Sequence, residues 1–167
     1  VKGVGLVVIG GVRAGSVNKH DNLKILPSNG IGIVRSLQVM DDDVEQAKAG
    51  DRVGIALRNA EESSLSQGSL IVLKEDQDSV EVHNKTELIF NSAAFARYEP
   101  AENGIIHVAI DLQFVVGRIE SVKENTIVVC WESPLMVRVK SDSHILICQL
   151  DAKPRIIGHS IDYKKLE

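Results

Sequence analysis

Two sets of residues in this sequence suggest a ligand site but lack part of what the chemistry needs. Gly10, Gly11 and Gly15 lie close together, yet no Lys-Ser or Lys-Thr follows them, and the sequence holds no Gly-x-x-x-x-Gly-Lys-Ser/Thr phosphate loop. The run Asp41–Asp43 lacks the following glycine and the distant glutamate of an EF-hand calcium loop. The glycines therefore predict turns, and the aspartates predict a solvated acidic loop.

A third set consists of Cys130, His144 and Cys148, whose thiols and imidazole are ligands that zinc prefers. His144 and Cys148 are four residues apart in a strand-like run, so both point to one face, but no Cys-x-x-Cys is present. Buried, unreactive cysteines and no metal site are the favoured interpretation, and a β-barrel enzyme with a metal at these residues stays an alternative. No catalytic residue is assigned, since Gly-x-Ser-x-Gly and His-Glu-x-x-His are absent.

The elements that position these residues are predicted to be strands almost throughout. Short β-branched runs of about 4–8 residues, separated by Gly, Asn, Asp and Ser, are typical of an all-β sandwich or barrel. The one helix-like stretch, Asp41–Ala49, predicts a helical turn or two, or an irregular loop. The strand-like runs are Val4–Ile9, Leu23–Leu26, Ile31–Leu37, Arg52–Leu57, Ser69–Leu73, Thr86–Phe90, Ile105–Ile110, Phe114–Ile119, Thr126–Trp131, Leu135–Val139, Ile145–Leu150 and Arg155–Ile157.

A polar segment divides the chain into two predicted domains. Residues 75–79, within Lys74–Ser79, follow a strong apolar run and precede a new one, so they predict a linker between domains 1–74 and 80–167. Residues 1–74 hold nine Lys or Arg against eight Asp or Glu, whereas residues 75–167 hold ten against fifteen. The fold class predicted is all-β, with two consecutive barrels of six or seven strands each.

Composition narrows the class of protein. The 44% hydrophobic share of 167 residues predicts a packed core and excludes disorder, and no run of about 18 apolar residues is present to cross a membrane. Two cysteines and no signal peptide predict a cytoplasmic protein. The net charge of −4 argues against a protein that coats nucleic acid by bulk charge. Because the sequence begins with Val1 and not Met, we expect a piece of something longer.

Several motifs of the first half, in their order and spacing, resemble the second domain of translational GTPases. They are Val1-Lys2-Gly3-Val4-Gly5, Val7-Val8-Ile9-Gly10, Arg13-Ala14-Gly15-Ser16-Val17, Ala47-Lys48-Ala49-Gly50-Asp51-Arg52-Val53-Gly54 and Gln67-Gly68-Ser69-Leu70. The opening and the segment 34–52 are most similar to the selenocysteine-specific elongation factor and less so to elongation factor Tu. Residues 80–167 fit the family's third domain, also a barrel, by size and strand pattern.

The resemblance implies which partners and cofactors belong to the parent protein. In this family a GTPase domain would precede Val1, and it would hold GTP and Mg; this fragment is expected to need no cofactor of its own. Aminoacyl-tRNA, the chain's own or a cognate GTPase domain, and the ribosome through the parent protein are the implied partners, with no membrane. The expected function is a non-catalytic, aminoacyl-tRNA-handling module; a decayed paralogue that serves as a protein-interaction scaffold is the alternative.

The sequence departs from the family pattern at two positions. His20 stands where a glycine usually precedes Asp21, which a loop tolerates if the backbone angle φ stays negative. Gln67 replaces the usual arginine before Gly68, which removes a positive charge near the surface expected to meet the aminoacyl end. The second change puts affinity for charged tRNA in question but leaves the fold unaffected.

Arg52 is the residue that the resemblance singles out for the aminoacyl pocket. It occupies a position where elongation factor Tu usually has Asn, and a fixed guanidinium there suits an ionised selenol better than a neutral hydroxyl. The alternative is that Arg52 is a surface strand residue and pairs with a loop carboxylate such as Asp42. If the pocket exists, Asp51 should begin the strand and accept backbone N–H bonds from a nearby turn.

Basic residues elsewhere are candidate tRNA contacts or ordinary solvated charges. Arg13, Arg35 and Arg58 are the candidates of the first half, beside Lys19 and Lys24. No Phe, Tyr or Trp occurs in residues 1–74, which disfavours binding of single-stranded nucleic acid by base stacking. In the acidic second half, a basic face would need to gather His107, Lys123, Arg138, Lys140, Lys153, Arg155, Lys164 and Lys165.

Overall fold

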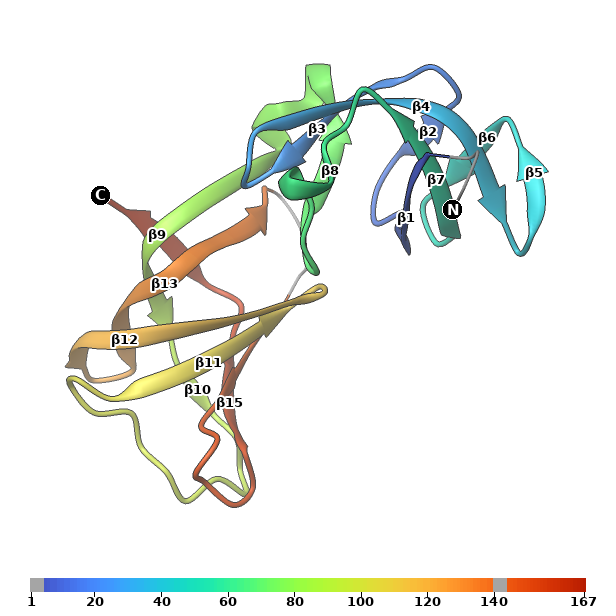
Figure 1. Ribbon diagram of the computed structural model, residues 1–167. Helices are drawn as coiled ribbons and strands as arrows, with labels where there is room; N and C mark the ends of the chain where they lie inside the picture. The colour runs from blue at the N-terminus through green and yellow to red at the C-terminus, as the bar shows by residue number, and fades with distance from the viewer. Residues whose placement is uncertain (1–4, 140–143) are drawn as a thin grey trace. The chain divides into compact units, whose positions relative to one another are not determined.

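Strands dominate both halves of the protein (Figure 1). The computed structural model describes residues 5–139 and 144–167, and in this part it has sixteen strands and two short 3₁₀ helices. The chain forms two compact units, the first ending at Asp78 and the second beginning at Ser79. In each unit the strands curl round a core, so the all-β barrel prediction is confirmed. The described residues of each unit form eight strands, so the predicted number of six or seven is wrong. None of the helices in the described residues has the length and apolarity to cross a bilayer.

The first unit contains β1 to β8. Its main sheet has the order β1-β7-β4-β3-β8, with β5 paired to the end of β4, and β2 and β6 form a separate ladder. Alternate residues point inward, and Val34, Leu37, Val53, Ile55 and Leu57 meet in the core. The elements are β1 Leu6–Gly11, β2 Ser16–Asn18, β3 Asn22–Leu26, β4 Gly30–Val39, β5 Asp42–Val44, β6 Gln46–Lys48, β7 Arg52–Arg58, η1 Glu62–Ser64 and β8 Leu70–Leu73.

The segment 41–49 is extended, so the prediction of a helical turn or an irregular loop there is wrong. Met40 and Asp41 both have positive φ, 51° and 70°, which makes a tight turn and folds β5 back on β4. Ala47 of β6 then points into the core and is fully buried. Short strands at a sheet edge carry too few apolar residues to show a period of two, which is why the sequence did not predict them.

The second unit contains β9 to β16 in one eight-stranded sheet of order β10-β15-β14-β11-β12-β13-β9-β16. The expected linker lies in η2 Lys74–Ser79, two 3₁₀ turns that lead directly into β9. Inward residues such as Ile106, Val108, Val129 and Ile147 pack in the core with Trp131. The strands are β9 Val80–Ile89, β10 Asn91–Ser92, β11 Ile105–Ile110, β12 Gln113–Lys123, β13 Thr126–Arg138, β14 Ile145–Cys148, β15 Ile156–Ser160 and β16 Tyr163–Leu166.

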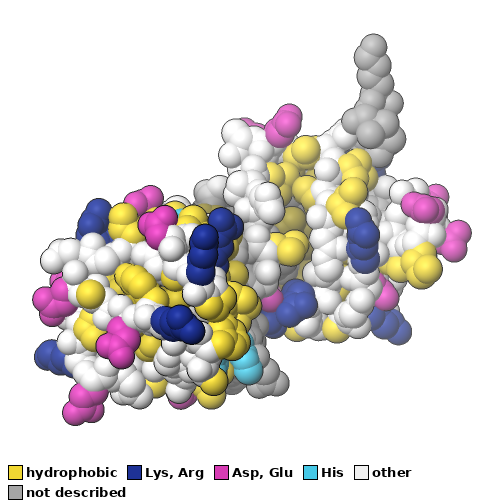
Figure 2. Space-filling view, turned by 90° about the horizontal axis from the view of Figure 1, so that it is seen from below, with side chains coloured by type: hydrophobic (Ala, Val, Ile, Leu, Met, Phe, Trp, Pro, Cys, Tyr) yellow, Lys and Arg dark blue, Asp and Glu magenta, His cyan; other side chains and the backbone are white. Residues whose placement is uncertain are grey.

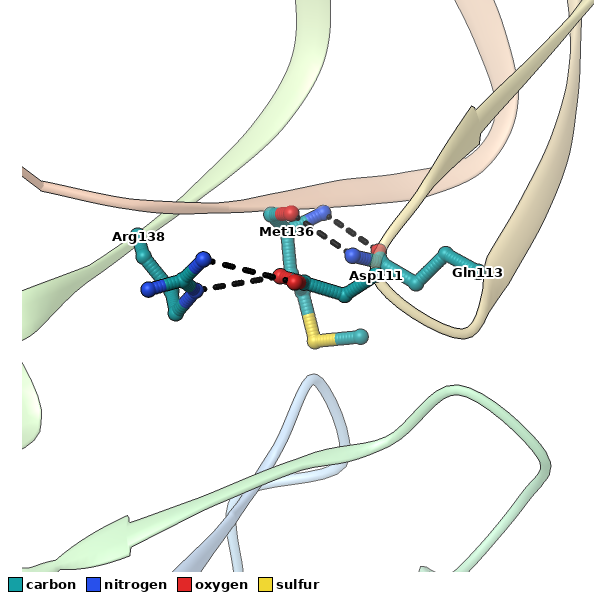
Figure 3. Close-up of polar contacts among 4 residues, drawn as sticks. All are labelled: Asp111, Gln113, Met136 and Arg138. Atoms are coloured by element: carbon teal, nitrogen blue, oxygen red, sulfur yellow. Dashed lines mark hydrogen bonds and ion pairs between the residues drawn. The ribbon is translucent and has the colours of Figure 1, made fainter. Parts of the chain in front are cut away.

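Side chains replace a backbone ladder where β12 and β13 separate. The two strands pair only between Gly117–Lys123 and Thr126–Trp131. Beyond this, the amide of Gln113 donates to the Met136 carbonyl at 2.8 Å and accepts from the Met136 N–H at 2.9 Å (Figure 3). The Arg138 guanidinium also donates two hydrogen bonds to Asp111, at 3.1 and 3.3 Å. These contacts hold the β11–β12 hairpin against the far end of β13.

A buried polar chain crosses the core between β9 and β13. The Trp131 indole N–H donates to the Thr86 hydroxyl at 2.8 Å, and that hydroxyl lies 3.0 Å from Nδ1 of His83. Nε2 of His83 lies 2.9 Å from the Glu81 carboxylate. These contacts link the indole of Trp131 to the Glu81 carboxylate through Thr86 and His83. Gly117 makes room for the indole, since a Cβ there would lie 2.6 Å from Trp131.

Candidate functional site

The outer side of the first sheet carries three of the four arginines singled out by the sequence. Along β7, Val53, Ile55 and Leu57 point into the core, so Arg52, Gly54, Ala56 and Arg58 point the other way. Neighbouring β4 contributes Arg35, and β1 contributes Val7 and Ile9. We call the surface defined by Arg35, Arg52, Arg58, Gly54, Val7 and Ile9 the basic face.

Arg52 lies at one end of this face and is exposed to solvent. It begins β7 opposite Gly11 of β1, which has no side chain to cover it. Gly54, the next outward residue of β7, is also bare, and a Cβ built there would meet nothing within 4 Å. Ile9 lies opposite Gly54 and is 71% exposed. An exposed guanidinium therefore lies beside a small apolar floor, an arrangement that suits an anion with an apolar neighbour.

The turn before Arg52 is held by its neighbour Asp51, as predicted. The Asp51 carboxylate accepts the backbone N–H of Lys48 at 2.7 Å. The Asp51 carbonyl accepts the N–H of Val12, and the Val12 carbonyl accepts the N–H of Gly50, both at 2.9 Å. Three bonds across the turn fix where β7 starts and thus where the arginine stem leaves the sheet. Asp42, the carboxylate considered as a partner for Arg52, is on β5, where it pairs with Val39 of β4.

Arg35 and Arg58 lie together at the other end of the face. Val34 pairs with Leu57 and Ser36 pairs with Ala56, so Arg35 is the extra residue of a β-bulge in β4. Arg58 lies opposite Ile33, next to that bulge, and its Nη2 donates to Nδ1 of His20 at 3.2 Å. The bulge was not predicted, although buried Val34 and Leu37, three residues apart, break the alternation of two that a regular strand keeps.

His20 adopts a backbone conformation that the sequence analysis did not expect. Its φ is +73°, in the left-handed region, so the expectation of a negative angle is wrong. The strain of about 1–2 kcal/mol that a side chain incurs there is opposed by the turn's bonds. The His20 N–H donates to Val34, and the Asp21 carboxylate accepts the N–H of Asn18 at 2.7 Å. The histidine ring thereby comes within reach of Arg58.

Arg13 belongs with Arg52 and not with the other two arginines. It is exposed and follows Val12, whose backbone bonds to Asp51 and Gly50 place it at the Arg52 end of the sheet. Arg52 and Arg58 are six residues apart on one side of β7, about 20 Å along the strand. The candidates therefore form two cationic groups, one at each end of the basic face.

The cations of the second unit do not gather in this way. Arg138 is bound to Asp111, Lys123 is at the β12–β13 turn, and Lys164 and Lys165 follow one another on the edge strand β16. Consecutive strand residues point to opposite sides, so the two lysines share no face. Lys140 lies outside the described residues. The single basic face considered for this unit is therefore wrong for these residues.

The three candidate metal ligands are not brought together. Cys130 is on β13 and Cys148 is on β14, and two strands, β11 and β12, lie between them, so they are about 14 Å apart across the sheet. His144 stacks on His159 with ring centroids 6.1 Å apart. Within residues 5–139 and 144–167, no three His, Cys, Asp or Glu side chains cluster as a metal site would require. The metal-enzyme alternative therefore has no site at these residues.

A small charge cluster on β9, β12 and β13 contains the exposed cysteine. Lys85 forms an ion pair with Glu120, whose other neighbour is the Cys130 thiol at 3.6 Å. The hydrogen bond to Glu120 raises the pKa of Lys85, and the same bond lowers the pKa of Glu120. Partial burial and the Glu120 charge raise the pKa of the Cys130 thiol. A thiol kept protonated in this way is a poor nucleophile at neutral pH.

Comparisons with known proteins show which protein family this chain resembles. Residues 5–72 match the family model described as elongation factor Tu domain 2. The selenocysteine-specific elongation factor of Methanocaldococcus jannaschii is 32% identical over 190 residues, covering 100% of this chain and 40% of the relative. The chain is homologous to the selenocysteine-specific elongation factors. It is a translation-factor β-barrel module, and it resembles the non-catalytic domains of a translational GTPase.

Two further relatives show what share of a longer protein this chain covers. An uncharacterized protein of M. jannaschii is 32% identical over 160 residues, covering 95% of this chain and 49% of the relative. The apo crystal structure of translation elongation factor SelB from Methanococcus maripaludis superposes with a TM-score of 0.80 at 25% identity, covering 99% of this chain and 41% of that one. The module thus spans about half the length, or less, of the relatives it matches.

Proposed function

We propose that this module handles aminoacyl-tRNA as part of an elongation factor of the selenocysteine-specific type. The observation that carries the proposal is the exposed Arg52 beside the bare Gly54 and the apolar Ile9. A guanidinium is always charged and donates in a plane, so it favours an ionised selenol over the neutral hydroxyl of a seryl group. In this proposal the aminoacyl group sits on the Gly54 floor with its side chain toward Arg52.

The second cationic group supports the same proposal at a distance. Arg35 and Arg58 lie about 20 Å from Arg52, which is the scale of several nucleotides and not of one aminoacyl group. Cations at that separation suit backbone phosphates, whose contacts position a nucleic acid without reading its sequence. GTP binding and hydrolysis would fall to another domain of the factor, because this sequence has no phosphate loop.

The test compares Arg52→Asn with the unchanged module, each joined to a GTPase domain. Removing one charge-assisted contact costs about 1.5–3 kcal/mol, so the preference for selenocysteinyl- over seryl-tRNA should fall by about ten- to 150-fold. The barrel should stay folded, since an exposed arginine adds little to stability. Lys48→Asn, on β6, which pairs with β2 and not with β7, is the matched control. Equal discrimination by Arg52→Asn and the unchanged module would exclude Arg52 from the pocket.

A protein-interaction scaffold is the second candidate, favoured by Gln67 and by the acidic second unit. Gln67 is exposed and uncharged where the family usually has arginine, and residues 75–167 carry five more acids than bases. A scaffold of this kind would bind neither selenocysteinyl-tRNA nor seryl-tRNA at any salt concentration tested. Restoring the charge with Gln67→Arg should tighten tRNA binding if the first proposal is right and change nothing if the scaffold is right.

A further inference from the structure

Arg58 of the basic face has a side-chain partner that the family pattern does not provide. Its Nη2 lies 3.2 Å from Nδ1 of His20, and His20 stands where the family usually has a glycine. A guanidinium has five N–H donors and no acceptor, so Arg58 donates and Nδ1 of His20 accepts. The ring proton of His20 is therefore on Nε2 and not on the nitrogen that faces the arginine.

The turn that carries His20 is fastened to β4 beside the second cation of this end of the face. The His20 N–H donates to the Val34 carbonyl at 2.9 Å, and the Val34 N–H donates to the Asp21 carbonyl at 3.0 Å. Val34 immediately precedes Arg35, the extra residue of the bulge. Two backbone bonds thus set how far the His20 ring lies from the strand, and the ring meets Arg58 next to this bulge.

The backbone of His20 gives no reason for a side chain at this position. Its φ of +73° is a conformation that glycine adopts at almost no cost, whereas a residue with a Cβ is strained there. His20 is also exposed, so its ring adds nothing to the core. Strained residues of this kind are concentrated at functional sites, where the surrounding structure holds them. The contact with Arg58 is therefore the feature that distinguishes His20 from a glycine here.

The charges of the first unit are dispersed, so each arginine depends on local contacts for its direction. In Figure 2, the lobe at the right, which is the first unit, carries Lys and Arg side chains interspersed with hydrophobic and uncharged surface. Residues 1–74 hold nine Lys or Arg against eight Asp or Glu, which leaves little attraction from net charge. Fixing a flexible arginine costs conformational entropy, and a hydrogen bond made before the ligand arrives removes part of that cost from binding.

A guanidinium held at one of its nitrogens keeps donors for an anion. Arg58 gives one N–H to His20, and its other N–H groups belong to an exposed side chain. Paired N–H groups of a guanidinium fit the oxygens of a phosphate. We propose that His20 is a positioning residue for Arg58, which it orients next to the Arg35 bulge to bind a backbone phosphate of tRNA. This role rests on the proposed function, because it requires that Arg58 contacts tRNA.

The test exchanges His20 for two residues that tolerate its backbone conformation. Glycine and asparagine both adopt positive φ, but only asparagine has an acceptor, Oδ1, at the place of Nδ1. With the module joined to a GTPase domain, His20→Gly should weaken binding of selenocysteinyl-tRNA about two- to tenfold, the range for one hydrogen bond. His20→Asn should restore the affinity of the unchanged module. In an Arg58→Gln background, His20→Gly should have no further effect.

Stability separates this role from a purely structural one. Neither His20→Gly nor His20→Asn should lower the midpoint of thermal unfolding in circular dichroism, since both new residues suit positive φ. Asn29→Gly, at another left-handed turn with a φ of +62°, is the matched control and should leave tRNA binding unchanged.

Equal affinity of His20→Gly and the unchanged module would overturn the proposal, as would a loss that His20→Asn shares or that persists in the Arg58→Gln background. When Arg58→Gln still weakens binding, such a result leaves the proposed function intact, whereas no binding of selenocysteinyl-tRNA by the unchanged module would overturn both.

Discussion

The outer faces of the two units differ more than their cores do. Both cores are built of inward Val, Ile and Leu, but the first unit presents arginines round a glycine floor and the second presents Phe114, Leu146 and Ile105. The exposed arginines of the first unit suit a solvated, charged ligand. The outer residues of the second unit are apolar, like those of a protein interior, although they are exposed to solvent. A barrel needs only its inner residues to fold, so the outer residues are free to specify a different partner for each unit.

The largest expected effect tests whether only the inner residues stabilise the fold, by changing an inner and an outer residue of one strand. Ile147→Ala should lower the free energy of unfolding by about 3 kcal/mol, because Ile147 is fully buried and its loss leaves a cavity. Leu146→Ala, on the outer side of β14, should cost under about 1 kcal/mol. Urea titration followed by Trp131 fluorescence reports the second unit, since this is the chain's single tryptophan. Similar losses for both variants would mean that the outer side of β14 belongs to the folding core.

A second measurement asks whether the polar chain inside the second unit adds to its stability. Thr86→Val removes the hydroxyl that bonds both Trp131 and His83, and leaving buried polar groups unpaired should cost about 2 kcal/mol. The same urea titration checks this, with a blue-shifted or quenched Trp131 spectrum as a second sign. Thr126→Val, at the start of β13, is the control. No loss of stability in Thr86→Val would show that the unit tolerates these groups unpaired.

A third measurement sharpens the assignment of the first face to phosphates. Arg35→Gln and Arg58→Gln should each weaken tRNA binding a few-fold and reduce the slope of log affinity against log salt by about 0.7–0.9, the value for one phosphate contact. Arg97→Gln, in the second unit, should change neither. Unchanged slopes for both basic-face variants would assign Arg35 and Arg58 to the solvated surface.

The smallest expected effect concerns Cys130, which lies beside the Lys85–Glu120 ion pair. Burial and the Glu120 charge raise the pKa of its thiol, so Glu120→Gln should lower that pKa and speed alkylation by iodoacetamide a few-fold at pH 8. Lys85, freed from Glu120, acts in the same direction. Peptide mapping separates Cys130 from buried Cys148, whose rate should not change. A slower reaction at Cys130 would mean that Glu120 assists the thiolate instead of opposing it.

The sequence predicted what depends on local periodicity and missed what depends on distant partners. Alternating runs such as Arg52–Leu57 gave the strands, because buried Val53, Ile55 and Leu57 recur every second residue. The strands β5 and β6 were missed because three residues carry no period, and their pairing is decided by Met40 and Asp41.

The sequence named candidate site residues one by one but not how they are arranged. The family resemblance singled out Arg52, whose role stays a prediction, and Asp51 lies in its turn as expected. That Arg35 stands in a bulge beside Arg58 follows from the pairing of β4 with β7, which no spacing within either strand records. The exposure of Ile105, Phe114 and Leu146 was not predicted for the same reason, since a run such as Ile105–Ile110 looks alike whether its second side meets protein or water.

The side-chain amide of Gln113 fixes which residues of β12 point into the core and which point outward. If β12 slipped by one residue, Phe114 would turn into the core and Val115 would turn out, because a strand's side chains alternate. Only in the present alignment does the Gln113 side chain reach both the N–H and the carbonyl of Met136. The two hydrogen bonds of Gln113 therefore oppose a shift in the register of the hairpin. Gln113 is itself buried, so a buried residue determines which side chains of β12 are exposed to a partner.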